Sequence, residues 1–324
     1  MTTRRNFVVG LTALYAASVC AQTKGRLIRI GTISSASPAG GGHFFDAFKK
    51  GMRELGYVEG QNIEYFLSYA EGRNERLETL AREHVERKVD LIITGNSNAT
   101  EIAQNATQTI PILMVAADPV DFGLIASLAK PGRNTTGLSS QFEDTVLKML
   151  QLLTEIVPKT KRFGILWGDN KLAESRWKPR LDNAATRLGI DLVYVDAKRP
   201  EQLKDAPQAF SAANVQALVV PAFGNFFGMV NEIVDVVYRT RLPSVFSHRE
   251  FVRSGGLLSF GPDIVDLFYR LALYAHKVIR GESPAQIPVQ QPTKFDLVIN
   301  MKTANALGIK IPQSILVRAD RVIE

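Results

Sequence analysis

The chain has 324 residues, of which 45% are hydrophobic and 22% are charged. This is the composition of a globular protein with an ample core, and it excludes a disordered chain and a polytopic membrane protein. The length fits two lobes of roughly 120–150 residues each, and the formal charge of +7 arises from 39 Lys and Arg against 32 Asp and Glu.

The first 21 residues have the pattern of an export signal. Arg4 and Arg5 precede an uncharged, mostly apolar run over residues 7–19, and Cys20 and Ala21 follow. A basic start, a short apolar run and small residues at the cleavage site are typical of a secretory signal peptide, and the paired arginines also fit the twin-arginine route. Cleavage after Ala21 leaves a periplasmic chain without cysteine, and loss of two arginines reduces the charge to 37 − 32 = +5.

Two alternatives for this segment remain open. Cys20 is acylated if the segment is a lipoprotein signal, although Val19 stands where such a signal has Gly, Ala or Ser. In the second alternative, residues 1–21 are the N-terminal helix of a cytosolic protein.

The remaining basic residues are dispersed among acidic ones, without a recognition helix or zinc finger, so we expect no nucleic-acid partner. No later apolar run reaches the length of about 18 residues that a membrane span needs.

Apolar runs and amphipathic stretches alternate along the chain, and the alternation occurs twice. In the first half, strands are predicted over residues 27–33, 62–69, 89–94 and 110–116, and helices over residues 44–55, 74–88 and 96–107. In the second half, strands are predicted over residues 162–167, 191–195, 216–220 and 243–246, and helices over residues 173–188, 200–213 and 229–239. A further strand at 257–260, a helix at 263–279, a strand at 295–299 and a helix at 303–307 complete the chain. This order predicts an α/β protein with two similar lobes, each built on a parallel sheet.

Three motifs resemble one known family. They are SLAKPGRNTTG at residues 127–137, GGLLSFGPD at residues 255–263 and QPTKFDLVIN at residues 291–300. Together with the closing residues 318–324, they resemble the substrate-binding proteins of ABC transporters, whose better-known members bind tryptophan or tyrosine. The similarity extends over essentially the whole chain after the signal.

The resemblance implies a type I periplasmic binding fold, in which three crossing strands join two Rossmann-like lobes that close over a ligand. The N-lobe is then expected at residues 26–139 plus 257–287 and the C-lobe at residues 140–255 plus 290–324. The expected linkers lie near residues 137–141, 249–256 and 289–293. The resemblance also implies that the protein captures a small molecule and delivers it to an ABC permease in the inner membrane, without a reaction. We expect a monomer with no cofactor and no metal.

Ligands of open α/β sheets bind beyond the carboxyl ends of the strands, so we examine those positions first in the N-lobe. Ser34 and Ser35 follow the first strand, and Asn96 and Ser97 follow the third at a helix start, where an anion is favoured. Ser97 is alternatively a plain helix cap. Asp118, after the fourth strand, either receives a ligand ammonium or forms an ordinary Asp-Pro turn.

The corresponding positions of the C-lobe are more aromatic. Trp167 ends a strand and offers either a stacking wall or a packed core side chain. Phe223 and Asn225 follow the strand that corresponds to residues 89–94, and Ser247 follows the next one. Asp263 is either an ammonium partner or a helix cap. An anion site, a carboxylate and aromatic walls together suit a zwitterionic amino acid with an aromatic side chain, or a related aromatic acid.

Enzyme motifs are absent from the sequence. It contains no Walker loop, no G-x-S-x-G elbow, no H-E-x-x-H and no C-x-x-C. Among the four His, His84 and His276 fall in surface helix patterns, His248 is expected on the surface near a hinge, and His43 begins a helix near the expected cleft. A ligand-sensing subunit for a signalling partner shares every feature named above, and an exported α/β enzyme is the third alternative.

Overall fold

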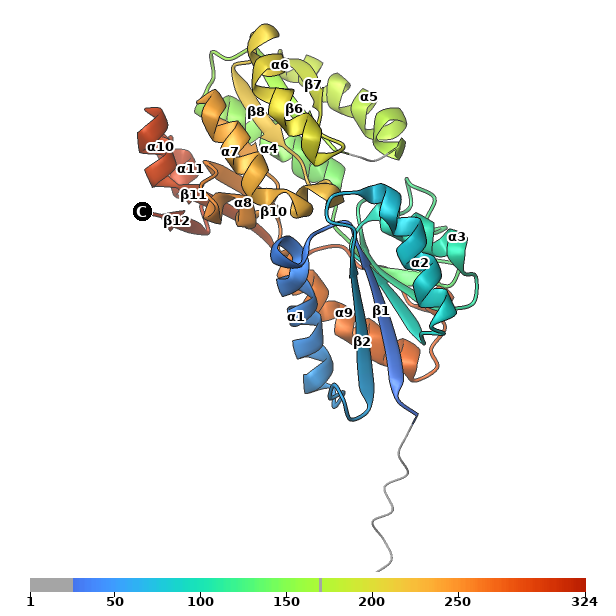
Figure 1. Cartoon of the computed structure of the whole chain (residues 1–324). Helices are drawn as coiled ribbons and strands as arrows, with labels where there is room; N and C mark the ends of the chain where they lie inside the picture. Colours follow the sequence, from blue (N-terminus) through green and yellow to red (C-terminus); the bar gives the residue numbers. More distant parts are fainter. Residues whose placement is uncertain (1–25, 169–170) are drawn as a thin grey trace, which may run out of the picture.

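The structure is a computed structural model that describes residues 26–168 and 171–324. The predicted export signal, residues 1–21, lies outside the described residues. Two sheets define two lobes (Figure 1). In the first lobe are β1 (Ile28–Ser34), α1 (Pro38–Glu54), β2 (Ile63–Tyr69), η1 (Asn74–Arg76), α2 (Leu77–Glu86), β3 (Leu91–Thr94), α3 (Ser97–Ala106), β4 (Ile112–Ala116), β5 (Thr135–Ser139), α9 (Ile264–Ile279) and η4 (Pro284–Gln286).

The second lobe contains the remaining elements. They are α4 (Phe142–Ile156), β6 (Arg162–Trp167), α5 (Lys171–Leu188), β7 (Asp191–Asp196), η2 (Pro200–Asp205), α6 (Ala206–Ala212), β8 (Ala217–Val220), η3 (Gly224–Gly228), α7 (Val230–Thr240), β9 (Ser244–Phe246), α8 (Arg249–Arg253), β10 (Leu258–Pro262), β11 (Phe295–Asn300), α10 (Met301–Leu307), α11 (Gln313–Leu316) and β12 (Arg321–Ile323).

The first sheet has the strand order β2-β1-β3-β4-β5, and all its pairs are parallel. Helices α1 and α9 cover one face and pack against each other, while α2 and α3 cover the other face (Figure 1). Apolar side chains fill both layers: Phe45, Phe48 and Met52 of α1 are fully buried, as are Leu77 and Ala81 of α2. Strands with buried residues on both faces are typical of a parallel sheet covered by helices.

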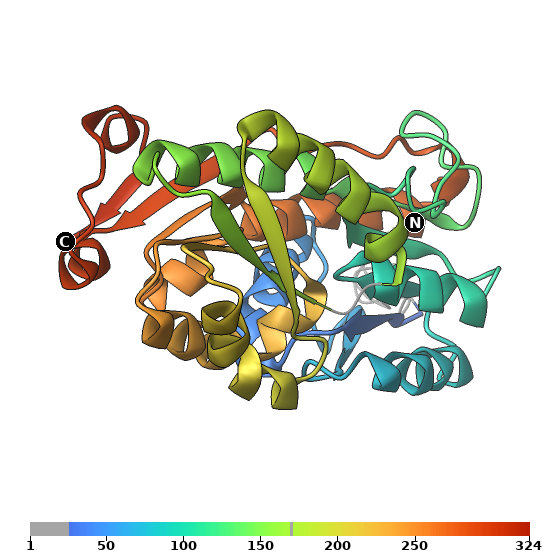
Figure 2. The same cartoon turned by 90° about the horizontal axis from the view of Figure 1, so that it is seen from above.

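The second sheet has the order β12-β11-β10-β9-β8-β6-β7. Its pairs are parallel except for β10 with β11. Helices α4 and α5 lie on one side of this sheet and α6, α7 and α8 on the other (Figure 2). The predicted fold class is therefore confirmed: two lobes, each built on a mostly parallel sheet.

The chain passes between the sheets three times, and one predicted assignment is wrong. The passages follow β5, β10 and η4. Residues 257–287 were expected in the N-lobe, but β10 pairs with β9 and β11 in the second sheet. The second passage therefore lies at Asp263, and the expected linker at 249–256 contains α8 instead, because the buried Phe251 and Val252 anchor that segment to the second lobe.

Helix α1 begins earlier than predicted. The sequence predicted the helix over residues 44–55, but Ser37 caps it by accepting a hydrogen bond from the N–H of Gly40 at 3.1 Å. Proline at the first helical position needs no hydrogen-bond donor there, so Pro38 starts the helix. Among the described residues, no helix is long and apolar enough to cross a bilayer.

Candidate functional site

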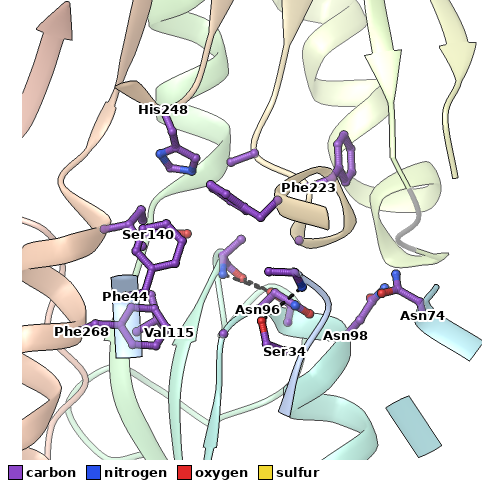
Figure 3. A pocket seen from close by; sticks show the side chains of 18 of the residues that line it. Ser34, Phe44, Asn74, Asn96, Asn98, Val115, Ser140, Phe223, His248 and Phe268 are labelled. Carbon is purple, nitrogen blue, oxygen red and sulfur yellow. Dashed lines mark hydrogen bonds between the residues drawn. The ribbon is translucent and has the colours of Figure 1, made fainter. Parts of the chain in front are cut away.

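A cavity lies between the two lobes, beyond the carboxyl ends of their strands. The space inside it that the centres of water-sized molecules can occupy is about 60 Å³. In Figure 3, Ser34 and Asn96 form the floor, Phe44 and Phe268 lie to one side, and His248 and Phe223 lie above. Both lobes therefore contribute walls to one site.

Four of the ten predicted residues line this cavity: Ser34, Asn96, Ser97 and Phe223. Asn96 is the cap of α3, and its Oδ1 accepts a hydrogen bond from the N–H of Ala99 at 2.9 Å. The amide of Asn96 also donates to Ser35 Oγ at 2.9 Å. Asn96 is thus fixed at both ends of its side-chain amide, and the start of α3 is held rigidly at the cavity.

Ser97 has a second structural role. Its hydroxyl donates to the carbonyl of Ala117 at 3.0 Å and accepts from the N–H of the same residue at 3.1 Å. These bonds join the start of α3 to the end of β4. They occupy the hydroxyl of Ser97, which is therefore committed to holding the start of the helix.

The second lobe contributes mainly aromatic side chains. Trp177 of α5 is 1% exposed and stacks on Phe142 with a centroid distance of 3.6 Å. Phe223 packs edge-on against Phe142 at 5.4 Å, and Phe227 packs edge-on against Phe44 of the first lobe at 5.3 Å. The walls are therefore built from rings that brace one another, which suits a flat apolar ligand.

The indole of Trp177 leaves one polar atom unused. Its Nε1 is buried and has no hydrogen-bond partner among the described residues. The Nε1 of Trp167 is in the same state, but only Trp177 lines the cavity. Because buried N–H groups are nearly always paired in proteins, Trp177 is a candidate donor to a ligand.

His248 is buried at the cavity, not exposed near a hinge as expected. It is 5% exposed, and its ring lies 4.9 Å from that of Phe227. Burial lowers the pKa of His248 to about 4, although the nearby carboxylate of Glu250 acts in the opposite direction. His248 is therefore neutral at neutral pH and offers the cavity one N–H and one acceptor nitrogen. His84, also expected on the surface, is buried and lies 3.0 Å from the carbonyl of Thr32.

Four other predicted residues lie outside the cavity lining and make structural contacts. Ser35 accepts the hydrogen bond from Asn96 described above. Trp167 is fully buried and packs edge-on against Tyr194 and Phe223. Asn225 is buried and donates to the carbonyl of Ala197 at 3.1 Å. Ser247 is also buried and donates to the carbonyl of Val220 at 3.4 Å.

The two predicted carboxylates also lie outside the lining. Asp118 accepts a hydrogen bond from the N–H of Glu143 at 3.2 Å, at the start of α4. Burial, together with neighbouring acidic side chains, raises the pKa of Asp118 to about 6. Asp263 caps α9 and pairs with Arg249, whose two terminal nitrogens lie 2.9 and 3.0 Å from its oxygens. Both carboxylates are committed to helix starts and protein partners.

The lobes touch at the rim of the cavity through glycines. A Cβ atom at Gly40 would lie 1.7 Å from the carbonyl oxygen of Phe227, and one at Gly228 would lie 2.5 Å from the backbone nitrogen of Gly72. Side chains add to this contact: Arg73 pairs with Glu201, Arg180 pairs with Asp121 at 3.1 Å, and His43 lies 3.4 Å from Glu250. The structure is thus a closed form in which the two backbones approach directly.

Several cavity residues escaped the sequence reasoning because they lie within helices, not at strand ends. Phe44 and Phe45 belong to α1, Trp177 to α5 and Phe268 to α9. The periodicity marked Phe44 and Phe45 as the buried side of a helix. Nothing in it distinguishes a residue that faces the sheet from one that faces the cavity.

Comparisons with known proteins give a consistent result. The family model described as ABC transporter substrate binding protein matches residues 39–323. The chain is also similar to the tyrosine-binding protein of Clostridioides difficile (strain R20291), with 28% identity over 264 residues that cover 81% of this chain and 76% of the other.

Solved structures share the fold. A conserved domain protein from Vibrio cholerae has a TM-score of 0.83 at 25% identity, covering 92% of this chain and 99% of its own. The ABC domain from Streptococcus pneumoniae in complex with L-Trp has a TM-score of 0.82 at 24% identity, covering 92% and 100%. A ligand-free, open substrate-binding protein from Clostridium difficile has a TM-score of only 0.64 at 24% identity, covering 92% and 99%. The lobe arrangement is therefore more similar to the ligand-bound structure than to the open one.

Proposed function

Because this chain belongs to the family of ABC transporter substrate-binding proteins, we propose that it captures an aromatic amino acid or a related aromatic acid between its lobes. The resemblance inferred from the sequence motifs is thereby confirmed at the level of the family. The ligand, its delivery to a permease of the inner membrane and an exported, periplasmic location are our proposals.

The observation that carries the ligand proposal is the ring-walled cavity between the two lobes. Aromatic side chains of both lobes line it, among them Phe44, Trp177, Phe223 and Phe227. Ser34, Asn96 and Ser97 supply polar groups from the first lobe, and His248 and Trp177 supply them from the second. A cavity with aromatic walls and a few placed polar groups orients a ligand that has one flat apolar part and one polar part. The names of the relatives, which mention tyrosine and tryptophan, agree with this ligand class.

Closure of the lobes is the proposed mechanism of capture. Rotation about the three passages near residues 139–142, 262–264 and 287–295 would separate the walls and open the cavity. The contact between Gly40 and Phe227 joins the two lobes in the closed form. Opening of the cavity would break this contact. A permease that recognises the closed form would then receive loaded protein in preference to empty protein.

The test is a ligand screen on the purified protein. A ligand that binds only the native state raises the melting temperature by mass action, so we expect a shift with phenylalanine, tyrosine, tryptophan or the corresponding aromatic acids. Sugars and aliphatic amino acids of similar size serve as controls and should give none. A screen in which only the controls shift the melting temperature would disprove the aromatic ligand.

A further inference from the structure

We infer that an ion pair across the seam between the lobes makes their closure depend on pH, so that mild acid strengthens ligand capture. The pair joins His43 of α1 in the first lobe to Glu250 of α8 in the second, and His43 Nε2 lies 3.4 Å from Glu250 Oε1. This inference rests on the proposed function, because it requires lobes that open to admit a ligand and close over it.

The pair lies in a groove on the seam that shares one wall with the ligand cavity. The starts of α1 and α7 line this groove together with α8, and Phe227 lines both the groove and the cavity. Phe227 also meets Gly40 at the seam, where a Cβ atom would lie 1.7 Å from the carbonyl oxygen of Phe227. Opening of the lobes would break this backbone contact and separate His43 from Glu250. The pair therefore belongs to the closed form.

Glu250 is ionised over the whole range in which histidine titrates. Its side chain is 13% exposed, against 37% for His43. Burial would raise the pKa of Glu250, but the contact with His43, together with His248 and a backbone amide, lowers it to about 2. Histidine, in contrast, changes its charge between pH 5 and pH 8. Protonation of His43 thus adds an attraction across the seam that the neutral imidazole lacks.

Other ion pairs on the seam do not respond to pH in this way. Arg73 pairs with Glu201, and Arg180 pairs with Asp121 at 3.1 Å. An arginine keeps its charge at every pH of interest, so these pairs hold the closed form equally at pH 5.5 and at pH 7.5. A proton that binds preferentially to the closed form favours ligand binding, because the ligand favours the same form.

Other titratable groups near the pair differ in the direction of their effect. Glu232 of α7 is exposed and lines the same groove, so it attracts a protonated His43 as Glu250 does. Asp46 lies one turn further along α1 and moves with His43, so closure does not change their separation. His248 has the opposite sign: burial lowers its pKa in the closed form, so through His248 acid favours opening.

The remaining charges nearby are held in ion pairs of their own. Arg249, next to Glu250 in the chain, binds Asp263 and Asp296. Helix α9 packs along α1, and its Asp266 is paired within α9 itself. Carboxylates and guanidinium groups keep their charges between pH 5.5 and pH 7.5. These groups therefore add no pH dependence in this range.

The experiment is a double-mutant cycle on ligand affinity, measured by calorimetric titration at pH 5.5 and at pH 7.5. The four proteins are the wild type, His43→Gln, Glu250→Gln and the double variant, and the probes are L-tryptophan, L-tyrosine and L-phenylalanine. These amino acids keep their charges over this range, and His248 is common to all four proteins, so its effect cancels. We expect the two positions to be coupled by about fivefold in affinity at pH 5.5 and by less than about twofold at pH 7.5.

The chain provides a matched control cycle on the same seam. Arg73→Gln, Glu201→Gln and their double variant remove a pair that also joins the lobes but contains no histidine. Coupling between these two positions should be the same at both pH values.

Proton uptake is a second measurement, and it needs only one variant. Titration at pH 6.5 in buffers of different ionisation enthalpy gives the number of protons bound together with the amino acid. The wild type should take up more protons than His43→Gln does, and equal uptake would overturn the inference.

The outcomes separate this inference from the proposed function. Binding with a coupling between His43 and Glu250 that is absent, or equal at both pH values, overturns the inference and leaves the aromatic ligand intact. Absence of binding by all three amino acids overturns the aromatic amino acid as ligand, and small-angle X-ray scattering of the ligand-free protein then decides the role of the pair. The wild type should be more compact than His43→Gln at pH 5.5 and equally compact at pH 7.5; equal radii of gyration at both pH values overturn the inference.

Discussion

The two lobes place different chemistry at equivalent strand ends. The order β2-β1-β3-β4 in the first sheet corresponds to β7-β6-β8-β9 in the second, so β3 and β8 hold the same position. After β3, Asn96 caps a helix at once, and α3 begins three residues after Thr94. After β8, the chain makes the turn η3, and α7 begins ten residues after Val220.

This difference in connection length separates two functions. The short connection fixes the start of α3 at the cavity as a rigid polar wall. The long connection carries Phe223 and Phe227 and makes the contacts across the cleft, including the approach of Gly224 to Asn96, where a Cβ atom would lie 2.5 Å from the side-chain nitrogen of Asn96. Topology thus determines where a site lies, whereas the loop after each strand determines its chemistry.

The largest expected effect comes from blocking the contact of the long connection with the first lobe. Gly40→Ala places a Cβ 1.7 Å from the carbonyl oxygen of Phe227, so the closed form cannot be reached without a shift of the backbone. We expect ligand affinity to fall by about 100-fold or more, because binding then draws on a disfavoured conformation. Calorimetric titration measures the change.

The chain provides a matched control for this variant. Gly42 lies in the same helix, and a Cβ there would be 3.9 Å from the hydroxyl oxygen of Tyr69, an ordinary contact. Gly42→Ala should leave the affinity unchanged, and neither variant should lower the melting temperature of the ligand-free protein, since alanine favours helix more than glycine does. Equal affinities for the two variants would mean that closure does not require this contact.

The second-largest effect is the pH dependence of the free energy of unfolding that arises from His248, which lines the cavity from the second lobe. His248 has a native pKa of about 4 against an ordinary value of 6.5, so between these values the unfolded state binds a proton that the native state does not. The contribution of His248 to the free energy of unfolding should therefore fall by about 2 kcal/mol as the pH drops from 7 to 5. Urea unfolding at both pH values measures it.

The comparison with His248→Gln isolates this contribution. Asp118 has the opposite sign, because its pKa is raised to about 6 and the native state takes up a proton first as the pH falls. Asp118 is present in both proteins and cancels in their difference. We expect the loss of stability between pH 7 and pH 5 to be smaller in His248→Gln. Parallel pH profiles would show that His248 is not buried in its neutral form.

A smaller effect is expected from the ring of the long connection. Phe223→Leu keeps an apolar side chain but removes the flat face, and we expect affinity for an aromatic ligand to fall about tenfold. Phe226 lies three residues further on, is fully buried and does not line the cavity. Both substitutions should lower the melting temperature by similar amounts, but Phe226→Leu should leave the affinity unchanged. A similar loss of affinity in both variants would remove Phe223 from the wall.

The sequence predicted the fold because its signals are local. Alternating apolar runs and amphipathic stretches specify strands and helices, and their order specifies parallel sheets. The error at β10 arose because strand pairing is not local. The apolar pattern of residues 258–262 predicts a strand, but it does not indicate whether that strand joins the first sheet or pairs with β9. The partner depends on where the preceding chain is anchored, here by Phe251 and Val252 of α8.

The site was predictable only in part, for a related reason. Strand ends are recognisable in sequence, and the search at those positions identified Ser34, Asn96, Ser97 and Phe223. The same search selected Asp118 and Asp263, whose partners, Glu143 and Arg249, come from other elements. A carboxylate at a strand end is indistinguishable in sequence from one that caps a helix, and only the assembled structure reveals which group it binds.

The smallest effect sharpens the comparison from the side of the short connection. Asn96→Ala removes the cap of α3 and should lower the free energy of unfolding by about 1 kcal/mol, a typical cost for such a cap. Asn96→Asp keeps an oxygen for the N–H of Ala99 and should preserve stability, but it loses the amide that donates to Ser35 and adds a negative charge at the polar wall. We therefore expect Asn96→Asp to bind an aromatic acid more weakly than the wild-type protein does, although its free energy of unfolding is preserved. Urea unfolding and calorimetric titration of both variants separate the two roles: affinities that simply follow stability would mean that Asn96 holds the helix and that the wall it forms does not sense the charge of the ligand.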